Sequence, residues 1–261
     1  VGSSFDQPIS SGEFTGLAVT RMLESIRLTD PQIKFYQASS SEIYGATNGK
    51  QNEKTSFKPR SPYAAAKLYG YWMTKMYREG YNMFVTNGIL FNHESPLRGL
   101  EFVTRKITNA VARIKIGLQS ELKLGNLESS RDWGYAPEYV EGMWKIMQQK
   151  KPDDYVLATN QTHTIKEFVQ AAFEYVDLDY KKYVKTDKKL YRILEVDSLQ
   201  GNSLKAKKQF GWNPKVKFKK LVELMVVADL DRWNRWKKGE RFPWDAPNYL
   251  NEDKMLFRIP K

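Results

Sequence analysis

The elements predicted along this chain indicate an α/β protein with a doubly wound parallel sheet and a smaller, helix-rich lobe. Segments with strand character alternate with helical segments from the start, which is typical of parallel strands joined by helices. The second half of the chain is richer in helices, and no Gly/Ser-rich linker precedes it. We therefore expect the two parts to pack together as one two-lobed unit.

The first half supplies the beginning of the alternation. Apolar side chains recur on one face of the first helical segment, and a Pro-containing turn ends it. Pro62 stands at the first-turn position of the second helix, where its missing N–H costs little. The predicted elements are helices at 12–28 and 62–79, buried strands at 33–39 and 83–91, and a polar loop at 46–61.

The second half continues with more helix than strand. Thr164 and Glu167 have the spacing of a capping box, and Gly117 and Gly211 are placed to end helices. Residues 180–200 have a mixed pattern and receive no assignment. The predicted elements are helices at 102–117, 136–149, 165–176, 203–211 and 218–239, with strands at 121–125 and 154–159.

Composition excludes several classes of protein. Hydrophobic residues make up 41% of the 261 residues, which argues for a folded globule, and no stretch approaches the roughly 20 apolar residues of a membrane-spanning helix. With no cysteine and two histidines, we expect no disulfide, no cysteine nucleophile and no metal site. The net charge of +12 suits an acidic partner, but the lysines are interleaved with apolar residues, which favours a solvated basic face over a nucleic-acid site.

Tyr63 and Lys67 are the first candidates for catalysis. Four residues apart at the start of a helix, they project from one face. An ammonium beside a phenol lowers the tyrosine pKa from about 10, so that the phenol can exchange a proton with a hydroxyl while hydride leaves the same carbon. The motif alone is weak, because Tyr71 and Lys75 repeat it in the same helix. Eight residues rotate about 80° around the axis, so the two pairs cannot share a face.

A second polar group follows the strand at 33–39. Ser40, Ser41 and Glu42 stand at its carboxyl end, which is where doubly wound sheets place their chemistry. A hydroxyl and a carboxylate there, together with the Tyr63 and Lys67 helix, form a set able to handle protons. On its own, the serine-rich turn is equally typical of a loop that ends a strand.

Taken together, five segments resemble the GDP-mannose 4,6-dehydratases, a branch of the extended short-chain dehydrogenase/reductase family. The most specific are the block FNHESP and the RDWG that follows it, which separate this branch from the wider epimerase and dehydratase relatives. The resemblance covers most of the chain, from about Ser4 to Asp231, and implies a Rossmann-type sheet. The segments are QASSSEIYG (37–45), SPYAAAK (61–67), NGILFNHESPLRG (87–99), FVTRKI (102–107) and SSRDWGYAPEYVEGMW (129–144).

The resemblance implies a lyase, specifically a hydro-lyase, that converts GDP-mannose to GDP-4-keto-6-deoxymannose by an internal NADP hydride cycle. Tyr63 would take the C4 hydroxyl proton, and Lys67 would tune Tyr63 and hold the nicotinamide ribose. Glu42 would remove the C5 proton, acidified once C4 is a ketone, and help deliver it to the leaving C6 hydroxyl. Ser40 stands where the family usually has threonine and would hydrogen-bond near O4.

The resemblance also assigns binding residues. His93 and Arg98 match positions that contact the cofactor, with a structural histidine as the alternative for His93. An arginine fork suits diphosphate oxygens, and a carboxylate can accept from guanine N–H groups or bind ribose hydroxyls. For Arg131, a salt bridge to Asp132 or a neighbouring acid is the alternative. The substrate-binding positions are Asn92, Arg131, Arg192 and Glu195.

The chain departs from the family pattern at its start. The Gly-rich βα turn that cradles a cofactor pyrophosphate has no counterpart in the sequence, so we expect the first half of the Rossmann domain to be absent from this chain. The segment 96–99 keeps only one of two arginines usual in the family. We expect residues 1–95 to be the C-terminal part of the NADP-binding domain. Residues 96–261 would be mainly the substrate lobe, with 136–160 returning to the sheet.

Two alternatives stay open. Another extended family member, such as a nucleotide-sugar epimerase or reductase, would share Tyr63 and Lys67, but only elimination requires a base such as Glu42. A truncated, non-catalytic remnant would keep the fold as a binding or assembly module. The resemblance further implies a GDP-sugar substrate, a homodimer or homotetramer, a cytoplasmic location, and no nucleic-acid or membrane partner.

Overall fold

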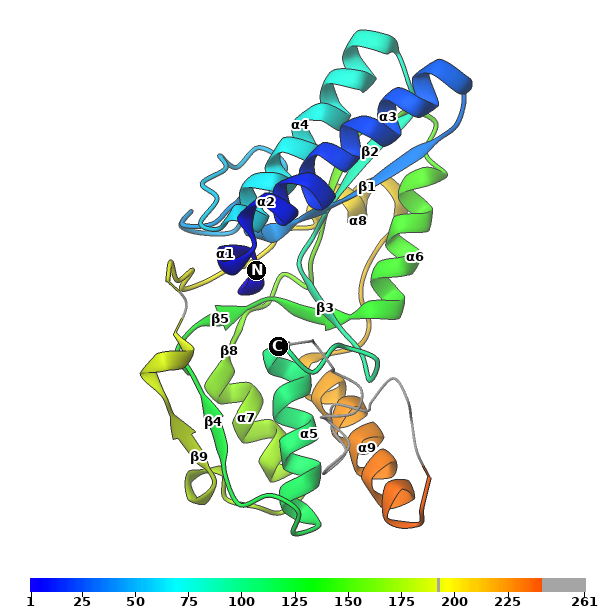
Figure 1. The fold of residues 1–261 in the computed structure, drawn as a ribbon. Helices are drawn as coiled ribbons and strands as arrows, with labels where there is room; N and C mark the ends of the chain where they lie inside the picture. Colours follow the sequence, from blue (N-terminus) through cyan, green and yellow to red (C-terminus); the bar gives the residue numbers. More distant parts are fainter. Residues whose placement is uncertain (192, 241–261) are drawn as a thin grey trace.

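The computed structural model describes residues 1–191 and 193–240 and contains a three-stranded parallel sheet, which confirms the predicted α/β class (Figure 1). The strand order is β1-β2-β7, and the register places Ser40 beside Leu90. Strand β2 is buried along its whole length, as a central parallel strand must be when helices cover both faces. The strands are β1 (Phe35–Ser40), β2 (Val85–Leu90) and β7 (Asp154–Leu157).

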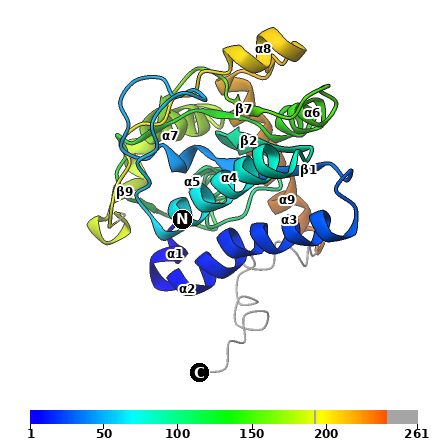
Figure 2. The same cartoon turned by 90° about the horizontal axis from the view of Figure 1, so that it is seen from above.

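Helices cover both faces of this sheet. Helices α3 and α4 lie on one side, with α4 packed on β1 and β2, and α6 and α8 lie on the other (Figure 2). The helical region begins earlier than predicted, because two single-turn helices and a π-helical turn precede α3. The elements are α1 (Ser3–Asp6), α2 (Pro8–Ser11), η1 (Gly12–Leu17), α3 (Ala18–Thr29), α4 (Pro62–Tyr81), α6 (Ala136–Met147) and α8 (Leu204–Phe210).

Helix α4 begins and ends for local reasons. The Ser61 hydroxyl accepts a hydrogen bond from the backbone N–H of Ala64 at 3.0 Å, and Pro62 occupies the first turn. Asn82 ends the helix in the left-handed conformation, with φ of 53°. Helix α4 packs against the 3₁₀ turn η2 (Ser41–Ile43), which directly follows β1.

The lower lobe in Figure 1 is built on three helices that share one apolar core: α5 (Val103–Lys115), α7 (Ile165–Glu174) and α9 (Phe218–Lys237). The predicted capping box is present at the start of α7. The Thr164 hydroxyl accepts from the N–H of Glu167 at 3.0 Å, and the Glu167 carboxylate accepts from the N–H of Thr164 at 2.6 Å. Short strand pairs border the core, namely β4 (Leu122–Leu124) with β9 (Val184–Thr186) and β5 (Ser130–Arg131) with β8 (His163–Thr164).

The chain passes between the lobes through short strands that the sequence pattern did not reveal. Strand β3 (Asn92–Glu94) follows β2 and pairs in parallel with β6 (Trp133–Tyr135), which leads into α6. The 3₁₀ turns η3 (Tyr180–Lys182) and η4 (Lys188–Leu190) occupy part of the unassigned region. Within the described ranges, no helix is both long and apolar enough to cross a membrane, and no three His, Asp or Glu side chains are grouped to hold a metal ion.

Candidate active site

The turn after β1 holds Glu42 in place. The Ser40 hydroxyl accepts from the N–H of Glu42 at 3.2 Å, and Glu42 is 9% exposed. Gly45 closes the turn with φ of +50°, and a Cβ there would lie 1.8 Å from the carbonyl oxygen of Lys58. Glycine is therefore required at this position, because the loop at 46–60 folds back directly over it.

Tyr63 and Lys67 project from one face of α4 towards the end of β1, as the spacing predicts. The Lys67 ammonium donates a hydrogen bond to the Ala38 carbonyl at 2.8 Å and lies 5.7 Å from the centroid of the Tyr63 ring. Burial lowers the pKa of Lys67. An ammonium has three N–H donors, and Ala38 takes one of them, so the other two remain available for a ligand within this part of the structure.

The pKa of the Tyr63 phenol depends on its burial and on side chains outside α4. Burial raises the pKa of Tyr63, and the hydrogen bond with the Ser40 side chain lowers it. The charge of Glu42 raises this pKa, and the charge of Arg98 lowers it. The net direction is upward, opposite to the lowering expected from Lys67, because desolvation of the phenolate outweighs the favourable contacts. The charge of Arg98 favours the ionised phenol, but it does not reverse this direction.

His93 and Asn92 lie on β3, just beyond the carboxyl end of β2. The Nδ1 atom of His93 is 2.9 Å from the Phe91 carbonyl, and since a carbonyl only accepts, Nδ1 carries the proton. The ring stacks on Tyr139, with centroids 5.1 Å apart and planes 20° apart. Burial lowers the pKa of His93, so the ring is neutral at pH 7 and Nε2 is an acceptor.

Arg131 and Glu195 form a second group in the lower lobe. The Arg131 guanidinium donates hydrogen bonds to the carbonyls of Ser130 and Val196, both at 2.8 Å. Its remaining terminal nitrogen lies 3.6 Å from a carboxylate oxygen of Glu195. The structure thus brings these two predicted residues together, whereas Arg192, predicted beside them, lies outside the described residues.

The acid next to Arg131 has a different partner. Asp132 accepts hydrogen bonds from the N–H and the hydroxyl of Thr159, at 2.8 and 2.6 Å, and from the N–H of Gly201 at 3.2 Å. Burial raises the pKa of Asp132 to about 6, and the hydrogen bonds oppose that rise. Asp132 therefore connects its own strand to the segments that contain Thr159 and Gly201. The acid beside the Arg131 guanidinium is Glu195.

The second Tyr/Lys pair has a structural role. The Tyr71 side chain is 4% exposed and donates its hydroxyl to Asp154 at 3.1 Å, and Lys75 lies 3.8 Å from Glu79 on the same helix. This outcome agrees with the argument that the two pairs occupy different faces of α4.

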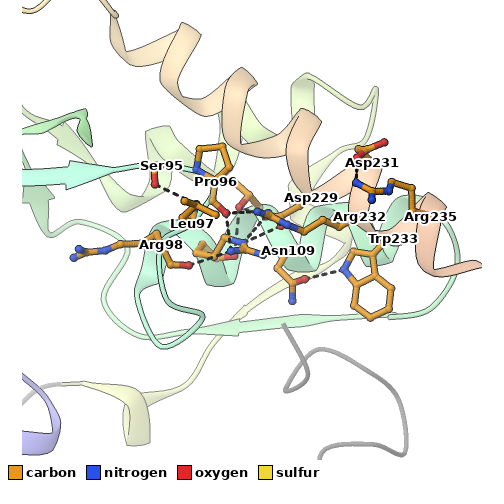
Figure 3. Close-up of polar contacts among 12 residues, drawn as sticks. Ser95, Pro96, Leu97, Arg98, Asn109, Asp229, Asp231, Arg232, Trp233 and Arg235 are labelled. Carbon is orange, nitrogen blue, oxygen red and sulfur yellow. Dashed lines mark hydrogen bonds and ion pairs between the residues drawn. The ribbon is translucent and has the colours of Figure 1, made fainter. Parts of the chain in front are cut away.

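Sequence reasoning missed the groups that surround Arg98. Its Nε lies 3.2 Å from the buried Glu94 carboxylate, and its guanidinium stacks on the Phe102 ring at 3.5 Å. Arg98 lies in the turn that follows β3, and the carbonyl oxygens of Pro96 and Arg98 in this turn (Figure 3) accept hydrogen bonds from Arg105, which is 2% exposed. A charged residue on the apolar face of α5 is the one sequence feature that could have pointed to this arrangement.

Comparison with known proteins identifies the family. Residues 1–225 match the family model described as GDP-mannose 4,6 dehydratase. The chain is 52% identical over 241 residues to GDP-mannose 4,6 dehydratase 1 of Arabidopsis thaliana, covering 91% of this chain and 67% of that protein. It is 44% identical over 248 residues to GDP-mannose 4,6 dehydratase of Homo sapiens, covering 87% and 67%. The chain thus spans about two thirds of these relatives, and 63% of the Drosophila melanogaster protein.

Solved structures agree on the fold. RMD from Pseudomonas aeruginosa complexed with NADPH superimposes with a TM-score of 0.80 at 20% identity, covering 89% of this chain and 78% of that one. The dTDP-glucose 4,6-dehydratase from Bacillus anthracis in complex with NAD gives 0.76 at 22% identity, covering 88% and 71%. The chain therefore belongs to the GDP-mannose 4,6-dehydratase family, a family of NADP-dependent hydro-lyases with a Rossmann-type fold.

Proposed function

We propose that the protein containing this chain converts GDP-mannose to GDP-4-keto-6-deoxymannose, with NADP as the hydride carrier. The proposal depends on the grouping of Ser40, Glu42 and Tyr63 at the end of β1. The Ser40 side chain forms a hydrogen bond with the Tyr63 phenol, and the charge of Glu42 raises the pKa of that phenol. A phenol and a carboxylate that share one small region can serve oxidation at C4 and elimination across C5 and C6 of the same hexose.

Each group has a defined proton to move. Tyr63 takes the proton of the C4 hydroxyl, while Ser40 donates a hydrogen bond near O4. Glu42 removes the C5 proton, and it returns a proton to the C6 hydroxyl, which leaves as water. When bound, NADP would supply the hydride acceptor for C4 and then the hydride donor for C6. A proton added at C5 completes that reduction and balances the proton that Tyr63 took from the C4 hydroxyl. Glu42 distinguishes this reaction from 4-epimerisation, which needs no base at C5.

The residues present fit the nicotinamide end of the cofactor. Lys67 keeps two N–H donors beyond the one that it gives to Ala38, so it can hold ribose hydroxyls. His93 offers Nε2 as an acceptor, and Arg98 supplies a fixed positive charge nearby. These three residues are the proposed cofactor-binding set. Residues 1–95 are accordingly proposed as the C-terminal part of the NADP-binding domain, to which 136–160 contribute α6 and β7.

We assign the nucleotide-sugar to the lobe formed mainly by residues 96–261. Asn92, Arg131, Arg192 and Glu195 are the proposed substrate-binding residues. The Arg131 and Glu195 pair supports this assignment, because it puts a cation and a carboxylate side by side, as a diphosphate and a guanosine require.

We also propose a homodimer or homotetramer in the cytoplasm. Helices α3 and α4, with the η1 turn before them, expose large apolar side chains, which a second copy of the chain would cover. They are Phe14, Met22, Leu28, Trp72 and Met76. Light scattering on the complete protein tests this, since a monomer at micromolar concentration would contradict it.

Product analysis tests the reaction. The complete protein, given GDP-mannose and NADP, should yield the 4-keto-6-deoxy sugar without accumulating NADPH, and steady accumulation of NADPH would contradict an internal cycle. Glu42→Gln should stop water loss while substrate binding persists. Glu53→Gln is the matched control, since Glu53 serves as an acceptor for the N–H of Val156 and glutamine keeps that acceptor. Equal turnover of both variants would remove Glu42 from its role.

A further inference from the structure

The loop at 46–60 meets the segment 196–202 at a buried glutamine, Gln51, which is 1% exposed. The N–H of Gln51 donates to the Gln200 carbonyl, and its own carbonyl accepts from the N–H of Asn202, both at 2.8 Å. Its side-chain oxygen accepts from the N–H of Gln200, also at 2.8 Å. Hydrogen bonds from both the backbone and the side chain of Gln51 therefore attach the loop to the segment.

The same side chain also connects the loop to the turn that holds Glu42. The amide nitrogen of Gln51 donates to the carbonyls of Thr47 and Gly49, at 3.1 and 2.6 Å. The Thr47 hydroxyl donates in turn to the Tyr44 carbonyl at 2.7 Å, and Tyr44 lies two residues after Glu42. Both N–H donors of the Gln51 amide and its oxygen thus have partners, which fixes the orientation of the side chain.

The other end of the segment lies beside the proposed nucleotide-binding pair. The Arg131 guanidinium donates to the Val196 carbonyl at 2.8 Å, and Val196 directly follows Glu195 in the sequence. Because Arg131 belongs to strand β5, the start of the segment is attached to the lower lobe, while its end is attached to the loop at 46–60. Hydrogen-bonded contacts and short stretches of chain therefore lead from the nucleotide-binding pair to the catalytic turn.

The segment has no room to shift where it meets Gln51. A Cβ added to Gly201 would lie 2.1 Å from the Cβ of Ala158 and 3.0 Å from the Phe91 ring. The N–H of Gly201 donates to the Asp132 carboxylate at 3.2 Å, and Gly201 pairs with Gln51 as an isolated parallel bridge. The segment therefore lies against the carboxyl ends of β2 and β7, at the same edge of the sheet where β1 ends.

A nucleotide-sugar carries its base and its hexose at opposite ends of one molecule, so its two binding regions need a fixed separation. We propose that Gln51 is a positioning residue that sets the separation between the Arg131 guanidinium and the Glu42 carboxylate. This inference rests on the proposed function, because it concerns where bound GDP-mannose places its hexose. A small displacement of the hexose from Glu42 lowers the rate steeply, while the nucleotide keeps its own contacts.

Gln51→Met in the complete protein tests the proposal, because methionine fills a similar space without the hydrogen bonds of the amide and leaves the backbone pairing in place. The kcat with GDP-mannose should fall about ten-fold or more. The Kd of GDP, measured by calorimetry, should stay within about two-fold of wild type. Gln170→Met is the matched control, since the exposed amide of Gln170 donates to Glu174 on the same helix, and it should change neither quantity.

Hydrogen exchange reports on the connection without turnover. The N–H of Asn202, which donates to the Gln51 carbonyl, should exchange faster in Gln51→Met and not in the control. GDP should slow the exchange of the Lys58 N–H, which donates to the Ile43 carbonyl at 3.1 Å, in wild type and not in Gln51→Met. An equal response of Lys58 to GDP in the two proteins would overturn the inference.

The kinetic outcomes separate the two proposals. An active wild type with an unchanged kcat in Gln51→Met would overturn the inference. A parallel loss of GDP affinity and kcat would also overturn it, because Gln51 would then support the nucleotide site alone. An inactive wild type would overturn the proposed function, and the response of Lys58 to GDP would still decide the inference. If Gln51→Met does not fold, Gln51→Glu keeps the acceptor for Gln200 and places a carboxylate against the two loop carbonyls, so the same measurements apply.

Discussion

The Tyr71 hydroxyl donates a hydrogen bond to the buried carboxylate of Asp154, which ties helix α4 to strand β7. Tyr63, two turns earlier in the same helix, faces the end of β1 and lies close enough to Ser40 for a hydrogen bond. One helix therefore carries two Tyr-x-x-x-Lys pairs with different roles, one assigned to stability by its contacts and one proposed for chemistry.

Phenylalanine at each position should separate these roles. Tyr63→Phe removes the proton acceptor, so we expect turnover to fall by about 10² or more with an unchanged thermal midpoint. Tyr71→Phe removes one hydrogen bond from the buried carboxylate of Asp154. We therefore expect a loss of about 1–3 kcal/mol in the free energy of unfolding, with normal turnover of the folded enzyme. Denaturant titrations and steady-state rates measure both, and the reverse pattern would exchange the assignments.

Arg78 pairs with the Asp154 carboxylate inside the lobe that contains the β1-β2-β7 sheet. Its two terminal nitrogens donate to the two carboxylate oxygens at 2.8 and 2.9 Å, and Asn87 donates to the same group at 2.9 Å. Arg78→Met should lower the free energy of unfolding by about 3–5 kcal/mol, because a buried charge loses its partner. Arg21→Met, at an exposed pair with Glu13, should stay within about 0.5 kcal/mol of wild type. Similar losses in the two variants would contradict the buried-pair argument.

Asp132 should make stability depend on pH. Its folded pKa of about 6 lies above the ordinary value of 3.8, so the folded state binds its proton more tightly than the unfolded state. The contribution of this group is fully present below pH 4 and is lost as pH rises through about 6, by an amount on the order of 3 kcal/mol. Asp132→Asn cannot titrate, so the difference in unfolding free energy between wild type and variant should change across this window. A constant difference from pH 4 to 7 would contradict the raised pKa.

The capping box of α7 offers a test of local stability. Thr164→Ala removes the hydroxyl that accepts from the N–H of Glu167, and we expect a loss of about 0.5–2 kcal/mol in the free energy of unfolding. Ser25→Ala on α3, whose exposed hydroxyl donates to the Arg21 carbonyl, should change stability by less than about 0.5 kcal/mol. Chemical denaturation of the three proteins measures both values, and a neutral Thr164→Ala would show that the cap is not needed.

Local features of this chain were predictable from sequence. Ser61 with Pro62, and Thr164 with Glu167, satisfy backbone donors within one turn of the chain, so their effect is visible at fixed spacing. The long amphipathic segments that became α4, α5 and α9 were predictable for the same reason. The two- and three-residue strands β3, β5, β6 and β8 were not, since so few residues carry no usable period.

Contacts across the chain set the rest of the candidate site. Arg105 and Asp229 are 124 residues apart in sequence, and no local pattern in either segment predicts that the two side chains meet. The expected lowering of the Tyr63 pKa failed for a related reason. Spacing along α4 reveals Lys67, but it does not reveal how deeply the phenol is buried, and burial is what raises its pKa.

The order β1-β2-β7 has a practical consequence for anyone handling this polypeptide alone. Within the described residues, β1 pairs with another strand along one side only, where it meets β2, so no strand borders its other side. An unprotected edge of this kind invites strands from other molecules. Samples of the isolated polypeptide are expected to self-associate more as concentration rises, and a strand supplied alongside β1 should suppress that tendency.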